Sequence, residues 1–241
     1  MPQDDRHITV VSGISPWAAG TNPPPESPDY RSTAFRHPRQ PLIIVPQTLS
    51  DLSAPVFGSD AVGPLDDDLT RQHAGEPAGQ RIVVSGRVLD DSGRPVPNAL
   101  IEIWQANAAG RYAHDNDTWD APLDPNFTGA GRALTDANGR YRFVTIRPGA
   151  YPWKNHPNAW RPSHIHFSLF GQSFLSRLVT QMYFPDDPLQ KLDPIFNAVP
   201  DPRARARLVA GFDLSLTIES WALGYSFDIV LRGSRETPLV D

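Results

Sequence analysis

The chain has 241 residues, a length that at roughly 150 residues per domain allows one large domain or two small ones. Its 26 prolines and 17 glycines, beside 10% aromatic residues, argue against a collagen, a helical bundle or simple disorder and favour a loop-rich β protein. The formal net charge of −5 argues against nucleic acid as a partner. Cysteine is absent, so any transition metal would need His, Tyr or carboxylate ligands.

The N-terminal ten residues, MPQDDRHITV, lack the apolar stretch of a signal peptide. No run of about eighteen apolar residues occurs anywhere in the sequence. We therefore expect a cytoplasmic protein that neither spans nor binds a membrane.

Residues 1–78 are predicted to form an extended arm followed by a short helix. Eleven of the 26 prolines lie in the first 64 residues, and the PPPESP run at 23–28 breaks any helix. The apolar run at 42–45 predicts an isolated strand within an arm that covers another surface. Asp residues at the start of DDDLTRQHAG and Gly75 at its end predict a short helix over 66–75.

Residues 79–241 are predicted to form a β core, which together with the arm makes one domain, 1–241. Asp91-Ser92-Gly93 and Asn138-Gly139 each separate two β-rich runs and predict two successive hairpins. Further strands are expected over 164–171, 176–184 and 225–233, and a short helix over 202–212. Several short strands separated by Gly, Pro and Asn predict an all-β fold, an antiparallel sandwich or barrel.

His164 and His166 lie two residues apart in a predicted strand, so both side chains fall on one face, as metal ligands can. Two histidines on an ordinary half-polar face are an equally good interpretation. A cupin site is disfavoured, because Glu219 is the first glutamate after His166 and no histidine follows it. A zinc site of three histidines would need His114 or His156.

Two tyrosines precede the histidine pair at turns. Tyr112 follows AAGR and Tyr151 lies in PGAYPW, where each alone is more often a core or rim aromatic than a ligand. Because a phenol has a pKa of about 10, only a strongly Lewis-acidic ion such as Fe(III) would make tyrosine an anionic ligand near neutral pH. Two tyrosinates and one hydroxide would balance the three charges of Fe(III).

Four separated blocks then carry a family resemblance: GRVLDDSGRPVPNALIEIWQANAAGRY, TDANGRYRFVTIRPGAYPW, RPSHIHF and TQMYFPDDPL. In this order they resemble the intradiol ring-cleavage dioxygenases, over roughly four fifths of the chain from about Thr48 onward. The resemblance implies an antiparallel β-sandwich of the intradiol dioxygenase or transthyretin-like type, with long loops, a proline-rich arm and a few short helices. The catechol-cleaving members carry a long helical N-terminal region that this chain lacks, which favours the branch acting on protocatechuate (3,4-dihydroxybenzoate).

The resemblance also implies the site. One non-haem Fe(III) per chain would be held by Tyr151 and His164 as axial ligands, and by Tyr112 and His166 as equatorial ligands, with a solvent hydroxide in the fifth position. Tyr151 would also take part in catalysis. Ring cleavage by O2 between the two hydroxylated carbons would give 3-carboxy-cis,cis-muconate.

Further residues match the family's site by position. Arg161 would stabilise negative charge on the substrate, a role that suits a group that stays charged, and Gln181 would hydrogen-bond a bound oxygen. Substrate contacts are expected from four aromatic or aliphatic side chains, Tyr30, Trp104, Trp153 and Ile195. Lys154 stands where the family has arginine, which keeps the charge and loses the forked geometry.

The family resemblance also implies a partner, a related α chain that lacks the iron ligands and forms part of the active-site mouth in a hetero-oligomer. A self-sufficient homo-oligomer is the alternative to this assembly. Two other functions stay open from the sequence. The chain could be an intradiol enzyme for another catechol such as hydroxyquinol, or a non-catalytic transthyretin-like binding module.

Overall fold

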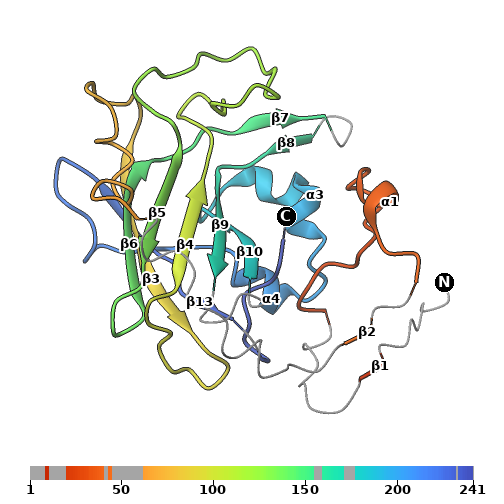
Figure 1. Cartoon of the computed structure of the whole chain (residues 1–241). Helices are drawn as coiled ribbons and strands as arrows, with labels where there is room; N and C mark the ends of the chain where they lie inside the picture. Colours follow the sequence, from red (N-terminus) through yellow and green to blue (C-terminus); the bar gives the residue numbers. More distant parts are fainter. Residues whose placement is uncertain are drawn as a thin grey trace.

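Two β-sheets packed face to face form the body of the chain in the computed structural model, which describes residues 9–10, 20–40, 43–44, 62–154, 159–170, 177–231 and 233–240 (Figure 1). The first sheet has the strand order β10-β9-β4-β5 and is antiparallel throughout. Its strands are β4 (Leu100–Trp104), β5 (Ala130–Leu134), β9 (His164–Phe170) and β10 (Arg177–Tyr183).

The second sheet is built around β3 (Arg81–Leu89). On one side β3 pairs antiparallel with β6, and on the other it runs parallel to β12 and then to β13, while β11 pairs with β12. The bounds of these strands are β6 (Arg140–Ile146), β11 (Gly211–Phe212), β12 (Leu223–Ser226) and β13 (Ile229–Val230). The predicted all-β sandwich is confirmed, with the difference that this second sheet is mixed.

The core lies between the two sheets and follows from the alternation of side chains along each strand. In β9, Ile165, Phe167 and Leu169 are fully buried in the core cluster. The Phe167 ring lies 5.9 Å from that of Tyr141 in β6 and 5.3 Å from that of Phe227, which lies between β12 and β13 of the second sheet. Burying one such side chain stabilises the fold by about 1.5–3 kcal/mol.

The two predicted hairpins are wrong in their pairing, although their strands and turns are formed. β3 and β4 flank the first turn but belong to different sheets, as do β5 and β6, which flank the second. Each turn therefore carries the chain from one layer to the other, and β3 pairs with β6 while β4 pairs with β5. Pairing across the first turn is limited to a bridge between Leu89 and Pro95.

The strand predicted over 225–233 is divided into β12 and β13, and its Arg232 lies outside the described residues. The division occurs where Phe227 passes Gly86 of β3. A Cβ added at Gly86 would lie only 1.8 Å from the carbonyl oxygen of Phe227, so only glycine permits this approach. The strands predicted over 164–171 and 176–184 are formed as β9 and β10, with Gly171 and Ser176 outside the described residues.

The predicted helix over 66–75 is not formed. The segment is a series of turns in which the Leu69 amide donates to Val144 O, and Asp66 O accepts from the Arg132 amide. The Asp68 carboxylate accepts hydrogen bonds from the backbone amide and the hydroxyl of Thr70. These contacts attach the segment to β5 and β6, and pairing with two strands replaces the helical hydrogen bonds.

The helices of the described residues are short and lie around the sandwich (Figure 1). They are α1 (Thr33–Arg36), the 3₁₀ helix η2 (Pro188–Leu192), α3 (Pro194–Asn197) and α4 (Pro202–Ala206). The helix predicted over 202–212 is thus shorter, because the chain beyond Ala206 turns to pair with β10. The Tyr183 amide donates to Leu208 O, and Tyr183 O accepts from the Ala210 amide.

The arm packs on its own chain over residues 20–40. The Asp201 amide donates to Gly20 O, and the side chain of Asn22 bonds both Glu236 and the Leu239 amide near the C-terminus. β1 (Thr9–Val10) pairs parallel with β2 (Ile43–Ile44), so part of the strand predicted at 42–45 is formed, whereas Leu42 and Val45 lie outside the described residues. Within the described part of the chain, no helix is long and apolar enough to cross a membrane.

Candidate metal centre and active site

The candidate site lies on the outer face of the first sheet, at one end of β9. Ile165 and Phe167 face the core, so His164 and His166 point the opposite way. The register places Gln181 and Trp104 directly beside His166, and Tyr183 beside His164. The indole of Trp104 stacks on the His166 ring, with centroids 4.7 Å apart and an interplanar angle of 8°.

The short hairpin of β7 (Tyr151–Trp153) and β8 (Ala159–Arg161) lies over this face and places Tyr151 opposite Arg161. Tyr112 comes from the loop after β4. That loop can approach Tyr151 because Gly110 has a φ of 79°, and a Cβ there would lie 2.2 Å from Ala150 O. The rings of Tyr112 and Tyr151 meet edge to face with centroids 5.5 Å apart.

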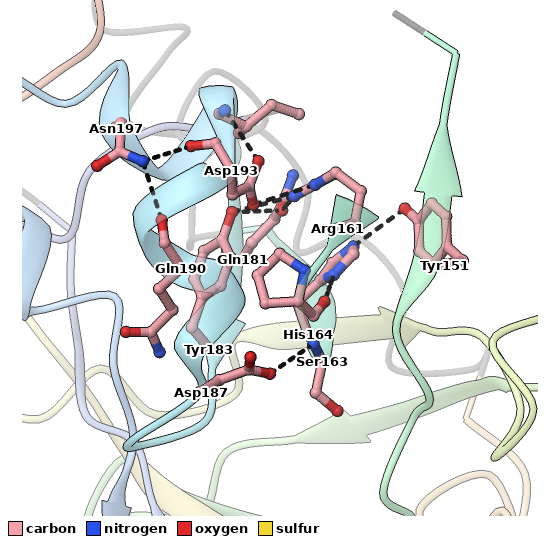
Figure 2. A network of polar contacts seen from close by, with 12 residues as sticks. Tyr151, Arg161, Ser163, His164, Gln181, Tyr183, Asp187, Gln190, Asp193 and Asn197 are labelled. Atoms are coloured by element: carbon pink, nitrogen blue, oxygen red, sulfur yellow. Dashed lines mark hydrogen bonds and ion pairs between the residues drawn. The ribbon is translucent and has the colours of Figure 1, made fainter. Parts of the chain in front are cut away.

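The four predicted metal ligands therefore converge. Tyr151 Oη lies 3.3 Å from His164 Nε2, and Figure 2 shows the phenol pointing toward this ring. The two histidine rings have centroids 4.9 Å apart, and Tyr112 lies 6.3 Å from His166 by the same measure. Two strands, β7 and β9, and the loop after β4 thus bring two phenols and two imidazoles to one place.

Buried polar atoms without a hydrogen-bond partner make this place suitable for binding a cation. The Tyr112 hydroxyl and His166 Nδ1 are buried and have no hydrogen-bond partner. His164 Nδ1 donates to Pro162 O at 2.7 Å, since a carbonyl can only accept. The lone pair of His164 is therefore on Nε2, the nitrogen that faces Tyr151. A histidine ligand fixed by a backbone carbonyl in this way is typical of metal sites.

The pKa values of these groups support the same interpretation. Burial, with the charge of Arg161 second, lowers the pKa of His166 to about 3 and that of His164 well below its usual value, so both rings are neutral. Burial raises the pKa of Tyr112 and of Tyr151, although Arg161 opposes this rise in both. A phenolate here needs a strongly Lewis-acidic cation. Among the described residues, no group of three or more His, Asp or Glu side chains offers another metal site.

Arg161 is buried at the centre of a polar network, which Figure 2 shows beside Tyr151 and His164. Its Nε donates to Asp193 Oδ2 at 3.1 Å, and its Nη2 donates to Tyr183 Oη at 3.0 Å and to Gln181 Oε1. Burial alone would lower the pKa of Arg161, but Tyr183, Asp193 and the two other tyrosines hold it above its usual value. The guanidinium is therefore a fixed positive charge next to the candidate centre.

The other predicted site residues lie at different distances from this centre. Gln181 is fully buried, and its Nε2 has no partner. Trp153 lies 5.6 Å from the Arg161 guanidinium, and Tyr30 of the arm packs edge-on against Trp153 at 4.8 Å. Ile195 is buried in the same small cluster as Tyr30 and Trp153. Trp104 packs on His166, as described above.

Three residues of the site were not foreseen from the sequence, namely Tyr183, Asp187 and Asp193. The Asp-Pro pairs at 187, 193 and 201 are typical of helix starts and could have been recognised in the sequence. This pattern does not indicate which other groups the carboxylates contact. Lys154 donates to Thr118 at 3.0 Å near the end of β7. His114 is exposed, its Nδ1 accepts from the Asn116 amide, and it forms no three-residue ligand group with other described His, Asp or Glu side chains, while His156 lies outside the described residues.

Comparison with known proteins defines the class. A family model described as "Dioxygenase" matches residues 52–233, and one for the N terminus of the protocatechuate 3,4-dioxygenase beta subunit matches residues 18–48. The chain therefore belongs to the intradiol ring-cleavage dioxygenase family, as the sequence blocks predicted.

Individual relatives agree with this family. The chain is 64% identical over 214 residues to the protocatechuate 3,4-dioxygenase beta chain of Burkholderia cepacia, covering 88% of this chain and 91% of that one. It is 28% identical over 210 residues to the alpha chain of the Pseudomonas putida enzyme, covering 83% and 99%. A solved 3-chlorocatechol 1,2-dioxygenase from Rhodococcus opacus 1CP superposes with a TM-score of 0.53 at 27% identity, over 70% of this chain and 65% of that one.

Proposed function

We propose that this chain is the metal-binding β subunit of a protocatechuate 3,4-dioxygenase. It would use O2 to cleave the ring of protocatechuate between the two hydroxylated carbons, giving 3-carboxy-cis,cis-muconate. The observation that carries the proposal is the convergence of Tyr112, Tyr151, His164 and His166 around buried polar atoms that have no partner. The 64% identity to a protocatechuate 3,4-dioxygenase beta chain supports the choice of substrate.

The proposed cofactor is one Fe(III), held by the two tyrosines and the two histidines. The intradiol family is generally iron-dependent, and two tyrosinates with a solvent hydroxide would balance the charge of a ferric ion in a buried site. Bound Fe(III) would supply the Lewis acidity that binds the catechol as a dianion and activates its ring toward O2. A non-catalytic binding module is disfavoured, because it gives no reason for these four side chains to meet.

The chain's own residues would carry three further tasks. Because burial raises the pKa of Tyr151, its phenolate oxygen is a strong base and suits the uptake of a catechol proton. Arg161 would place a fixed positive charge beside the ring as negative charge develops there. The unpartnered Nε2 of Gln181 would donate a hydrogen bond to an oxygen of the reacting molecule.

The substrate's position is proposed from the wall residues Tyr30, Trp104, Trp153 and Ile195. The aromatic ring would lie against these side chains, while the carboxylate end would face the mouth of the site near Tyr30. We propose that a related α chain completes this mouth in an α/β hetero-oligomer, which agrees with the similarity to alpha chains. A cytoplasmic location remains a prediction.

Metal analysis combined with a visible spectrum tests the proposal. Purified protein should contain close to one iron per chain and show a red-brown tyrosinate-to-iron charge-transfer band. Adding protocatechuate without oxygen should change this band, and adding hydroxyquinol or catechol under the same conditions should change it less. Colourless protein with stoichiometric zinc would contradict the proposal.

A further inference from the structure

Three Asp-Pro pairs in the segment after β10 begin the three short helices η2, α3 and α4 in the same way. Asp187, Asp193 and Asp201 each precede the first helical proline and accept the backbone N–H two residues further on through Oδ1. This is the ordinary role of aspartate at a helix start, where proline loses nothing by lacking an N–H. One carboxylate oxygen is enough for it.

Two of the three aspartates use their second oxygen elsewhere. Asp193 Oδ2 accepts from Arg161 Nε at 3.1 Å, and Asp187 Oδ2 accepts from the Ser163 amide at 3.0 Å (Figure 2). Both contacts reach the same three residues, 161–163, which are the last residue of β8 and the two residues that link it to β9. Among the hydrogen bonds of the described residues, the Asp201 side chain makes only the one that it accepts from the Arg203 amide at the start of α4.

The segment 161–163 fixes the orientation of two groups of the site, the Arg161 guanidinium and the His164 ring. Arg161 provides the buried guanidinium, and Pro162 O holds His164 Nδ1 at 2.7 Å. Ser163 is further fixed by its hydroxyl, which donates to Pro148 O. The carboxylate of Asp193 is fully buried, so it also neutralises the charge of Arg161 where no water can do so.

We propose that Asp187 and Asp193 are positioning residues for the reaction, which use their second carboxylate oxygens to hold segment 161–163 and thereby fix the Arg161 guanidinium and the His164 ring. This inference rests on the proposed function for its effect on turnover. Its structural part, the restraint of segment 161–163, does not.

Substitution by asparagine separates the two roles of each aspartate. An asparagine side chain has one acceptor oxygen where aspartate has two, and it remains a good residue at a helix start. Asp193→Asn and Asp187→Asn can therefore keep the helix start only by losing the contact with Arg161 or Ser163. Asp201→Asn loses nothing of this kind and is the matched control.

The first measurement is turnover of protocatechuate by the complex of this chain with its α partner. Asp193→Asn should lower kcat by about 10- to 100-fold, the usual effect of removing a group that orients a catalytic side chain, while KM changes little. Iron content and the charge-transfer band should stay as in the unsubstituted complex. Asp201→Asn should leave kcat within about twofold. Should Asp193→Asn not assemble, Asp193→Ser keeps an acceptor for the helix start and supplies the same comparison.

A double-mutant cycle then shows whether Asp193 acts through Arg161. In an Arg161→Leu background, Asp193→Asn should lower kcat less than about threefold further, because the group that it positions is already gone. Equal losses in both backgrounds, or a wild-type kcat for Asp193→Asn, would overturn the proposal for Asp193.

Hydrogen exchange measured by mass spectrometry on the same complexes tests the restraint without any activity. Peptides that contain the Ser163 amide should exchange faster in Asp187→Asn than in the unsubstituted complex, and Asp201→Asn should leave their exchange unchanged. Unchanged exchange in Asp187→Asn would overturn the proposal for Asp187. If the unsubstituted complex does not turn over protocatechuate, the proposed function fails, while the exchange result still decides whether the segment is held in this way.

Discussion

Tyr112 is the side chain whose environment most requires a cation. Its hydroxyl is buried without a partner, and burial, followed by the nearby Tyr151, raises the pKa of the phenol well above its usual value. Left alone, the group would be an unsatisfied neutral phenol, which costs about 1–3 kcal/mol. As a ligand it would lose its proton and gain a partner.

Replacement of Tyr112 by phenylalanine should therefore change the metal centre and not the fold. We expect Tyr112→Phe to weaken or shift the charge-transfer band and to lower the iron content, because one of two tyrosinate donors is gone. The thermal midpoint of the metal-free protein should stay the same or rise. A band of unchanged energy and intensity would contradict the assignment of Tyr112 as a ligand.

The role proposed for Arg161 can be separated from metal binding by substitution. Arg161→Leu should lower kcat by about 100-fold or more while most of the iron is retained, since the role proposed for the guanidinium is to stabilise developing charge and not to bind the metal. Arg161→Lys keeps the charge, but a single ammonium group cannot reach Asp193, Gln181 and Tyr183 together, so its kcat should also fall. Turnover and iron content are measured on the same preparation. Parallel loss of iron and activity would contradict this separation.

At the scale of elements, β6 and the β12–β13 junction are joined across Gly86. Tyr141 lies opposite Gly86 in the sheet, and its hydroxyl donates to Phe227 O at 2.5 Å over the space that the missing side chain leaves. Burial, and then the charge of Asp228, raises the pKa of Tyr141 well above 10. The folded chain therefore keeps this proton at a pH where the unfolded chain loses it.

Linkage then gives a pH dependence with a definite sign. Above the unfolded pKa of about 10, the unfolded state binds fewer protons than the folded state, so the free energy of unfolding falls as pH rises. Tyr141→Phe should cost about 1–3 kcal/mol at neutral pH, because Phe227 O loses its donor, and should make the fall above pH 10 less steep. Denaturant unfolding at pH 8 and pH 10.5 measures both. Equal slopes for the two proteins would contradict the raised pKa.

Local sequence patterns predicted which segments form strands but not which strands pair. Alternation of apolar and polar residues places β6 and β9 correctly, because burial on one face leaves a period of two. A turn such as Asn138-Gly139 reverses the chain without deciding whether the next strand joins the same sheet or the facing one. The failed helix at 66–75 has a similar cause, because its backbone groups pair with Arg132 and Val144, which are far away in the sequence.

The sequence predicted the proposed ligands of the candidate site but not the residues that surround Arg161. The residues proposed as ligands were named from their resemblance to family blocks, and the structure brings them together, while their roles stay predictions. Asp193 and Tyr183 were missed because their importance arises from contacts with Arg161 across 32 and 22 residues of sequence. No local period or motif reports such a contact, since a buried aspartate before a proline has the same local pattern as an exposed one.

At the scale of the whole molecule, the arm was expected to cover another surface, and its described part packs on the C-terminal segment of its own chain. It still presents apolar surface, since the Phe35 side chain in α1 is 94% exposed and lies on the same arm as Tyr30. Aromatic residues are enriched at protein–protein interfaces relative to the rest of the surface.

We therefore predict that this chain works as part of an α/β complex. Chain expressed with its α partner should elute as one larger species and turn over protocatechuate, and chain expressed alone should be smaller and at least about tenfold less active per iron. Size-exclusion chromatography and turnover on matched preparations make the comparison. Full activity from the lone chain would contradict the prediction and favour a homo-oligomer.

The identity of the product tests the central claim most directly. The residues proposed as ligands would hold a ferric ion whose Lewis acidity activates the ring of a bound catechol, and cleavage would then fall between the two hydroxylated carbons. Protocatechuate incubated with the iron-loaded complex and O2 should give 3-carboxy-cis,cis-muconate as the sole ring-cleavage product, identified by its NMR spectrum and mass. A yellow semialdehyde, formed by cleavage beside the hydroxylated carbons, would contradict the account.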